Sequence, residues 1–171
     1  MKIKLSELNR CSPSDFVAVC GPLFEHSPWI AQRTASARPF DSRQALHEAL
    51  RQTVDTATSD EQLTLVRAHP DLVGRAALGR NLTQASAAEQ AASGLADVAL
   101  DDALRLDDFN AAYRSKFGFP FVICARQNRK EAILAAFPAR LANTRDQELR
   151  TALDEIAKIA WHRLFDAIEE G

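Results

Sequence analysis

Apolar residues recur at helical spacing along most of the chain. The clearest stripe is Leu46, Leu50 and Val54, which repeats every four residues after Ser42. A serine followed by such a stripe is typical of a capped amphipathic helix. Similar signals predict further helix starts at Ser12, Ser59, Ser86 and Asp101.

Prolines predict where several of these helices end. Pro22 interrupts the apolar set that follows Ser12, so we expect a kink or break there. Pro70 ends the helix that starts at Ser59, because the residue before a proline is pushed out of the α region. Pro138 is expected to stop a helix over residues 128–137.

The longest predicted helix covers residues 144–169, and its apolar stripe contains Arg163 at a position where an apolar residue is expected. The one continuous apolar run with strand character covers residues 119–124. It is short and no second strand is obvious, so we interpret it as an extended connector.

Composition agrees with this helical pattern. The 171 residues include 30 alanines, six glycines and one tyrosine, and alanine is the best helix former. The length suits one domain. We therefore predict an all-α fold, a single-domain helical bundle of about eight helices over residues 1–171.

Charge and cysteine content exclude several classes of protein. The formal net charge of −2 gives no electrostatic support for nucleic-acid binding. No apolar run is long enough for a membrane helix, and residues 1–10 lack the apolar core of a signal peptide. Three cysteines without a CxxC pair argue against a disulfide framework or a Cys-rich zinc site, so we expect a cytoplasmic protein.

His69 is the first candidate for chemistry. It stands just before Pro70, at the C-terminal end of a predicted helix, where the helix dipole favours a protonated imidazole. Such a histidine can donate a proton. The alternative is a histidine that only satisfies the carbonyls at the helix end.

Ser86, Glu89 and Gln90 form the second candidate, at the predicted start of a helix where backbone N–H groups favour an anion. The alternative is that Ser86 and Glu89 form a capping box, which would occupy Glu89 with the backbone. Arg163 is the third candidate, because its guanidinium suits a carboxylate or a planar ureido group. Its alternative is a buried ion pair or a snorkelling side chain.

Several stretches, taken in order, resemble the 2-oxo-4-hydroxy-4-carboxy-5-ureidoimidazoline (OHCU) decarboxylases of purine catabolism. The resemblance covers about residues 4–168. The matching motifs are Phe24-Glu25-His26-Ser27-Pro28-Trp29, Arg67-Ala68-His69-Pro70-Asp71-Leu72, Leu82-Thr83, Ser86-x-x-Glu89-Gln90, Gly94-Leu95, Phe109-Asn110, Tyr113, Lys116-Phe117-Gly118-Phe119-Pro120-Phe121-Val122-Ile123, Glu155-Ile156-Ala157-Lys158-Ile159 and Arg163.

The resemblance implies an all-α homodimer that acts on a small ureidoimidazoline acid and uses no metal or organic cofactor. It implies that His69 donates a proton and that Glu89 is its partner. The residues that it implies for substrate binding are Pro70, Ser86, Gln90, Phe121, Val122, Ile123, Cys124, Ala125 and Arg163.

Two other functions remain open at this point. The same scaffold would also suit a decarboxylase or related lyase for a different ureido or imidazole acid. A helical module that binds a partner through an apolar face, without catalysis, would need no convergence of His69, Glu89 and Arg163.

Overall fold

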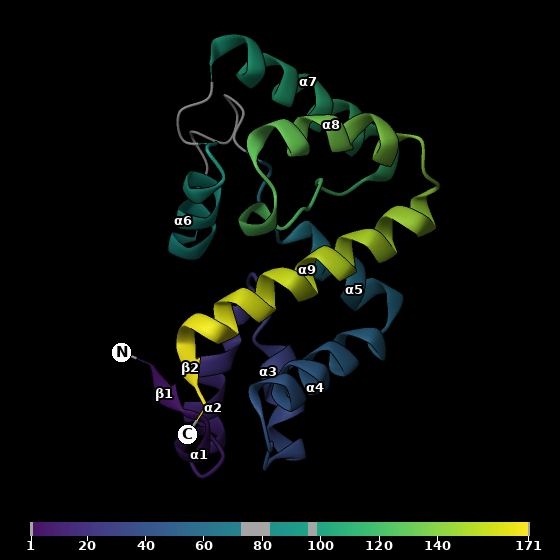
Figure 1. Ribbon diagram of the computed structural model, residues 1–171. Coiled ribbons are helices and arrows are strands. Elements are labelled where there is room, and N and C mark those ends of the chain that lie inside the picture. Colours follow the sequence, from purple (N-terminus) through teal and green to yellow (C-terminus); the bar gives the residue numbers. More distant parts are fainter. Residues whose placement is uncertain (1, 73–82, 96–98, 171) are drawn as a thin grey trace. The chain divides into compact units, whose positions relative to one another are not determined.

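The computed structural model describes residues 2–72, 83–95 and 99–170, and about 71% of these residues are helical. The predicted all-α class is confirmed. Leu82, one of the motif residues, lies outside the described residues. In chain order the described elements are β1 (Ile3–Lys4), α1 (Leu5–Leu8), α2 (Pro13–Cys20), η1 (Gly21–Leu23), α3 (Trp29–Thr34), η2 (Ala35–Ala37), α4 (Arg43–Asp55), α5 (Ser59–Arg67), α6 (Gln84–Ala92), α7 (Leu100–Phe117), η4 (Ala125–Gln127), α8 (Lys130–Leu141), α9 (Arg145–Ala167) and β2 (Ile168–Glu169) (Figure 1).

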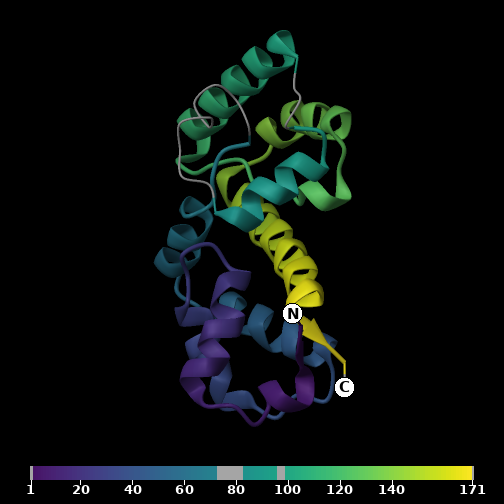
Figure 2. The ribbon, with the colours of Figure 1, turned by 90° about the vertical axis from the view of Figure 1, so that its left-hand side faces the viewer.

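The chain divides into two compact units that share helix α9. Unit 1 contains Met1–Ala68 and Ala157–Gly171, and unit 2 contains His69–Ile156. In unit 1 the two short strands pair in parallel, with Ile3 opposite Ile168. Figure 2 shows this pair close to both chain ends. Segments from the two ends of the sequence therefore build unit 1 together.

The helices of unit 1 begin and end largely where the sequence predicts. Ser42 caps α4 by accepting the N–H of Ala45 at 3.0 Å, and the stripe of Leu46, Leu50 and Val54 is buried. Ser12 caps α2, which ends at Cys20 and passes into the 3-10 turn that contains Pro22. The predicted break at Pro22 is confirmed.

Unit 2 is built around an aromatic core. Helices α7 and α8 lie side by side (Figure 1). Phe121 stacks on Phe137 of α8 with ring centroids 3.8 Å apart, and it meets the edge of Tyr113 of α7 at 5.3 Å. The segment between α7 and η4, residues 118–124, has no regular secondary structure, as the extended-connector interpretation expects. Its side chains fill the core between two helices.

One predicted helix end is wrong. Pro138 does not stop α8, which continues to Leu141 with the proline inside it. The helix gains a buried contact from that extra turn, because Arg140 pairs there with Glu148. Tertiary contact thus outweighs the hydrogen bond that a proline cannot make. Within the part of the chain that the structure describes, no helix is both long and apolar enough to cross a bilayer.

Candidate active site

The segment that carries His69 is held firmly in unit 2. His69 is buried and lies just beyond the C-cap of α5, Ala68. Asn110 on α7 donates from Nδ2 to the carbonyl of Leu72 at 3.0 Å, and Arg114 donates from Nε to the Asp71 carboxylate at 2.8 Å. The half-buried Pro70 separates His69 from these anchored residues. The position of the imidazole is therefore restrained by the short stretch of backbone between His69 and the anchored residues.

Helix α6 supplies the second group of candidates, and here the predicted capping box is wrong. Thr83 is the N-cap, since its hydroxyl accepts the N–H of Ser86 at 3.2 Å and its backbone is extended. Ser86 stands at the third helical position and Glu89 lies about a turn further on. Glu89 is too deep in the helix to cap its first turn, so the capping alternative for this carboxylate is excluded.

The three candidates on α6 share its buried face. Ser86, Glu89 and Gln90 are each less than a tenth exposed. Positions i, i+3 and i+4 of a helix lie on one side, so the three polar groups point in a similar direction. The sequence has placed a serine, a carboxylate and an amide where a purely structural helix would carry apolar residues.

Gln90 joins α6 to the His69 segment. Its Nε2 donates to the carbonyl of Asp71 at 3.4 Å, while its buried Oε1 accepts no hydrogen bond within the described part of the chain. A buried acceptor without a donor is costly, and natural sites of this kind are usually satisfied by water or by a ligand. Gln90 thus offers an acceptor for an N–H group.

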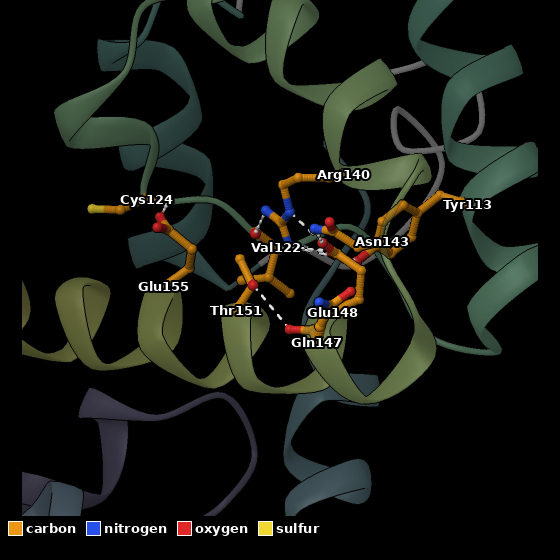
Figure 3. Close-up of polar contacts among 9 residues, drawn as sticks. All are labelled: Tyr113, Val122, Cys124, Arg140, Asn143, Gln147, Glu148, Thr151 and Glu155. Atoms are coloured by element: carbon orange, nitrogen blue, oxygen red, sulfur yellow. Dashed lines mark hydrogen bonds and ion pairs between the residues drawn. The ribbon is translucent and has the colours of Figure 1, made fainter.

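The connector from Phe121 to Ala125 is the third part of the site, and all five residues are buried. Two charged side chains hold its backbone (Figure 3). Arg140 donates from Nη1 to the carbonyl of Val122 at 2.6 Å, and Glu155 accepts the N–H of Cys124 at 2.7 Å. The backbone from Val122 to Cys124 is thereby fixed by side chains of α8 and α9.

Arg140 belongs to a buried network around Glu148 (Figure 3). The Glu148 Oε2 atom accepts from the Tyr113 hydroxyl and from Arg140 Nε at 2.9 Å, and Oε1 accepts from Asn143 at 2.8 Å. Burial raises the pKa of the Tyr113 hydroxyl, and its bond to Glu148 raises it further, although Arg140 acts in the opposite direction. The phenol therefore stays protonated and acts as a donor.

The electrostatics of Cys124 link the connector to α6. Burial raises the pKa of this thiol, and the carboxylates of Glu155 and Glu89 raise it further, against the lowering effect of backbone N–H groups. The charge of Glu89 is thus close enough to act on Cys124, and α6 packs beside η4. A raised pKa keeps the thiol protonated and disfavours a role as a nucleophile.

Arg163 lies in unit 1, where it forms a buried ion pair. Its Nη2 stands 2.9 Å from Oε1 of Glu25, and the two side chains are 7% and 1% exposed. His26 has a positive φ of 46° and is exposed, whereas its neighbours Glu25 and Ser27 are buried. The ion-pair alternative for Arg163 therefore describes a contact that exists, and a role in substrate binding stays a prediction.

Sequence reasoning missed the buried charges that hold the connector. Glu148 and Glu155 lie on α9 with Ala152 between them, in steps of four and three. This stripe runs beside the apolar stripe that contains Arg163, and it was overlooked because its members are mostly charged. Two carboxylates on the flank of the buried face of a long helix were the available signal for partners such as Arg140.

In unit 2, the described structure groups the His69 segment, the polar face of α6 and a buttressed connector. These features define an all-α protein with a candidate acid–base site built from a histidine, a carboxylate and fixed backbone groups.

Comparison with known proteins specifies the class further. The OHCU decarboxylase family model matches residues 9–165. The chain belongs to the OHCU decarboxylase family.

Individual relatives show how much of the chain the likeness covers. This chain is 40% identical over 163 residues to 2-oxo-4-hydroxy-4-carboxy-5-ureidoimidazoline decarboxylase of Haloferax volcanii, and the match covers 95% of each chain. It is 39% identical over 165 residues to the protein of that name from Amia calva, covering 96% of this chain and 94% of the relative. A crystal structure of (S)-allantoin synthase is similar with a TM-score of 0.76 and 28% identity, over 97% of this chain and 54% of that one.

Proposed function

We propose that this protein is a carboxy-lyase that converts 2-oxo-4-hydroxy-4-carboxy-5-ureidoimidazoline to (S)-allantoin, a step in urate degradation. The observation that carries the proposal is the attachment of the His69 segment to α6 through Gln90, next to Glu89 on the same helix. Family membership and the names of the relatives supply the substrate.

The reaction suits a protein that positions the substrate and donates a proton to it. The departing carboxylate of the substrate lies one carbon from a C=N group. As the C–C bond breaks and CO2 leaves, its electron pair moves towards that C=N group, so the substrate serves as its own electron sink. The protein then has to add a proton to one face of the ring. We therefore propose that the reaction needs no metal or organic cofactor.

Each candidate residue has a proposed role. His69 is the proton donor and Glu89 orients it. Ser86 and Gln90 bind the substrate by hydrogen bonds. The Oε1 atom of Gln90, which accepts no hydrogen bond from the residues that the structure describes, supplies an acceptor for a ureido or ring N–H. Pro70 and the connector backbone from Phe121, Val122, Ile123 and Cys124 to Ala125 line the site. Arg163 contacts a polar or anionic group of the substrate.

The test of activity supplies the substrate from its precursor. Urate, urate oxidase and the hydrolase that opens the ring are combined, this protein is added, and circular dichroism follows the enantiomer of allantoin. We expect (S)-allantoin to form faster than it does without the protein. Racemic allantoin at the uncatalysed rate would refute the proposed activity.

The roles of His69 and Glu89 are tested by His69→Ala and Glu89→Gln. Because Thr83 caps α6, Glu89→Gln removes a charge without disturbing the cap. We expect the rate to fall by roughly 10²–10⁴ in each variant, as for lost acid–base catalysis, with the thermal midpoint nearly unchanged. Glu131→Gln on the exposed face of α8 is the matched control. A wild-type rate for Glu89→Gln would exclude the proposed pairing.

We further propose a cytoplasmic homodimer. The three cysteines are free thiols, as expected in a reducing compartment. Leu100 and Leu104, one turn apart on α7, are 60% and 43% exposed, and a second copy of the chain would cover apolar side chains of this kind. Light scattering should give twice the chain mass at micromolar concentration. A monomer under these conditions would exclude the dimer and leave the proposed catalysis unaffected.

A further inference from the structure

Two polar side chains of helix α7 contact the segment that follows His69. Asn110 and Arg114 are four residues apart and so lie on one face of the helix. Asn110 donates to the Leu72 carbonyl at 3.0 Å, and Arg114 Nε lies 2.8 and 3.1 Å from the two carboxylate oxygens of Asp71. One helix face thus holds both the backbone and the side chain of consecutive residues.

A third anchor comes from α6. Gln90 Nε2 donates to the Asp71 carbonyl, which fixes the same residue from a second helix. Asp71 is thereby held at its carboxylate by α7 and at its carbonyl by α6. The distance between Glu89 on α6 and the His69 segment then depends on these anchors.

The short path from the anchors to the imidazole makes them relevant to catalysis. Only Pro70 lies between His69 and Asp71. Its ring fixes φ near −65°, and it also restricts the residue before it to extended conformations. A displacement of Asp71 is therefore passed on to His69 with little chance of being absorbed by the backbone between them.

We propose that Arg114 and Asn110 are positioning residues that aim His69 by holding Asp71 and Leu72. This inference rests on the proposed function of His69 as a proton donor. Neither residue is proposed to touch the substrate. Their contribution is to keep the donor within the small tolerance that proton transfer requires, since a misplacement of about 1 Å can cost roughly a hundredfold in rate.

The main variant is Arg114→Met, which removes the charge and keeps most of the side-chain length. The Arg114 side chain is 37% exposed, so the variant is expected to fold. We expect kcat to fall by about 10- to 100-fold with KM within about twofold of wild type. Arg114→Lys should recover part of the rate, because an ammonium still pairs with Asp71 but cannot reproduce the directed Nε–H contact with both carboxylate oxygens.

The stereochemistry of the product distinguishes a misplaced His69 from a general loss of structure. With variant concentrations raised until the reaction outruns uncatalysed decay, Arg114→Met should yield allantoin with a reduced (S) excess. Lys130→Met is the matched control. Lys130 of α8 pairs at 2.9 Å with Asp102, which lies on α7 as Arg114 does, and both side chains of this pair are about a quarter exposed. The kcat and product excess of Lys130→Met should match wild type.

Asn110→Asp tests the second anchor without changing the size of the side chain. It replaces the Nδ2 donor by an oxygen that faces the Leu72 carbonyl, so the His69 segment is repelled from α7. We expect the same fall in kcat and (S) excess. If Arg114→Met and Asn110→Asp both kept wild-type kcat and product excess, or if Lys130→Met lost as much as they do, the proposal would be overturned.

A readout independent of turnover keeps this inference separate from the proposed function. The ring nitrogen signals of His69, assigned by their loss in His69→Ala, are followed by NMR in protein labelled with ¹⁵N-histidine. We expect them to shift or broaden in Arg114→Met and to stay in place in Lys130→Met. Unchanged signals in Arg114→Met would contradict the positioning role even if the wild-type protein had no decarboxylase activity.

Discussion

Replacing Glu148 by glutamine tests the buried network that holds the connector. The Glu148 side chain is fully buried and lies 2.8 Å from Arg140 Nη2, whose own side chain is only 10% exposed. Glu148→Gln keeps the shape and removes the charge, so the guanidinium remains buried without its counter-ion. Breaking a buried pair in this way costs about 3–5 kcal/mol, and a domain of this kind has only about 5–15 kcal/mol in total. We expect a loss of about that size in the free energy of unfolding.

Urea denaturation measures this loss as a lower midpoint with an unchanged slope. Glu61→Gln is the matched control, because Glu61 pairs with Arg33 at 2.5 Å on the surface, where solvent screens the charges. Glutamine also closes the capping box that Glu61 forms with Thr58, so little else changes. We expect a much smaller shift of the midpoint.

A double-mutant cycle completes the test. Arg140→Met with Glu148→Gln removes both charges, so the double variant should lose less stability than the sum of the two single losses, by more than about 1 kcal/mol. If Glu148→Gln cost less than about 1 kcal/mol, or if the losses were additive, the network would not hold the unit together by paired charge.

Two other predictions concern single side chains. Arg163→Lys should lower kcat/KM by more than about tenfold, since hydrogen bonds to charged groups are worth about 1.5–3 kcal/mol, while the ammonium keeps the bond to Glu25. Activity assays and thermal melts check this prediction, and full activity would leave Arg163 a structural ion-pair partner. Cys20 should resist iodoacetamide in the native protein, because burial above all raises its pKa to about 12. The half-buried Cys11 should be labelled first, which mass spectrometry shows, and equal labelling of both would contradict the burial argument.

Local signals were sufficient where a helix depends on its own residues. Helix α4 has its cap and apolar stripe within one segment, and both were predicted. The predicted start of helix α6 at Ser86 is wrong, because Thr83, three residues earlier, is its N-cap. The motif Ser-x-x-Glu is a local signal, but the helix begins earlier, because the hydroxyl of Thr83 already satisfies the first-turn N–H of Ser86.

The rest of the candidate site depends on contacts that are distant in sequence. The candidates on the His69 segment and α6 are predictions from their place at helix ends and from the family resemblance: His69, Ser86, Glu89 and Gln90. The anchors of the His69 segment were not predicted, because Arg114 and Asp71 are 43 residues apart and nothing in either neighbourhood indicates the other. The same reason explains the unexpected course of α8 past Pro138, which reflects the pairing of Arg140 with a glutamate on the next helix.

The discontinuous make-up of unit 1 has a consequence for folding during synthesis. A ribosome releases the chain from its N-terminus, so the first helices of unit 1 emerge long before α9. Glu25 then lacks its ion-pair partner Arg163, which follows 138 positions later, and β1 lacks its partner strand β2. Until that point the nascent unit exposes an unpaired strand edge and a carboxylate destined for burial. A chain cut short before α9 therefore lacks the partners that complete its first half, and we expect such a fragment to be a substrate for chaperones or proteases.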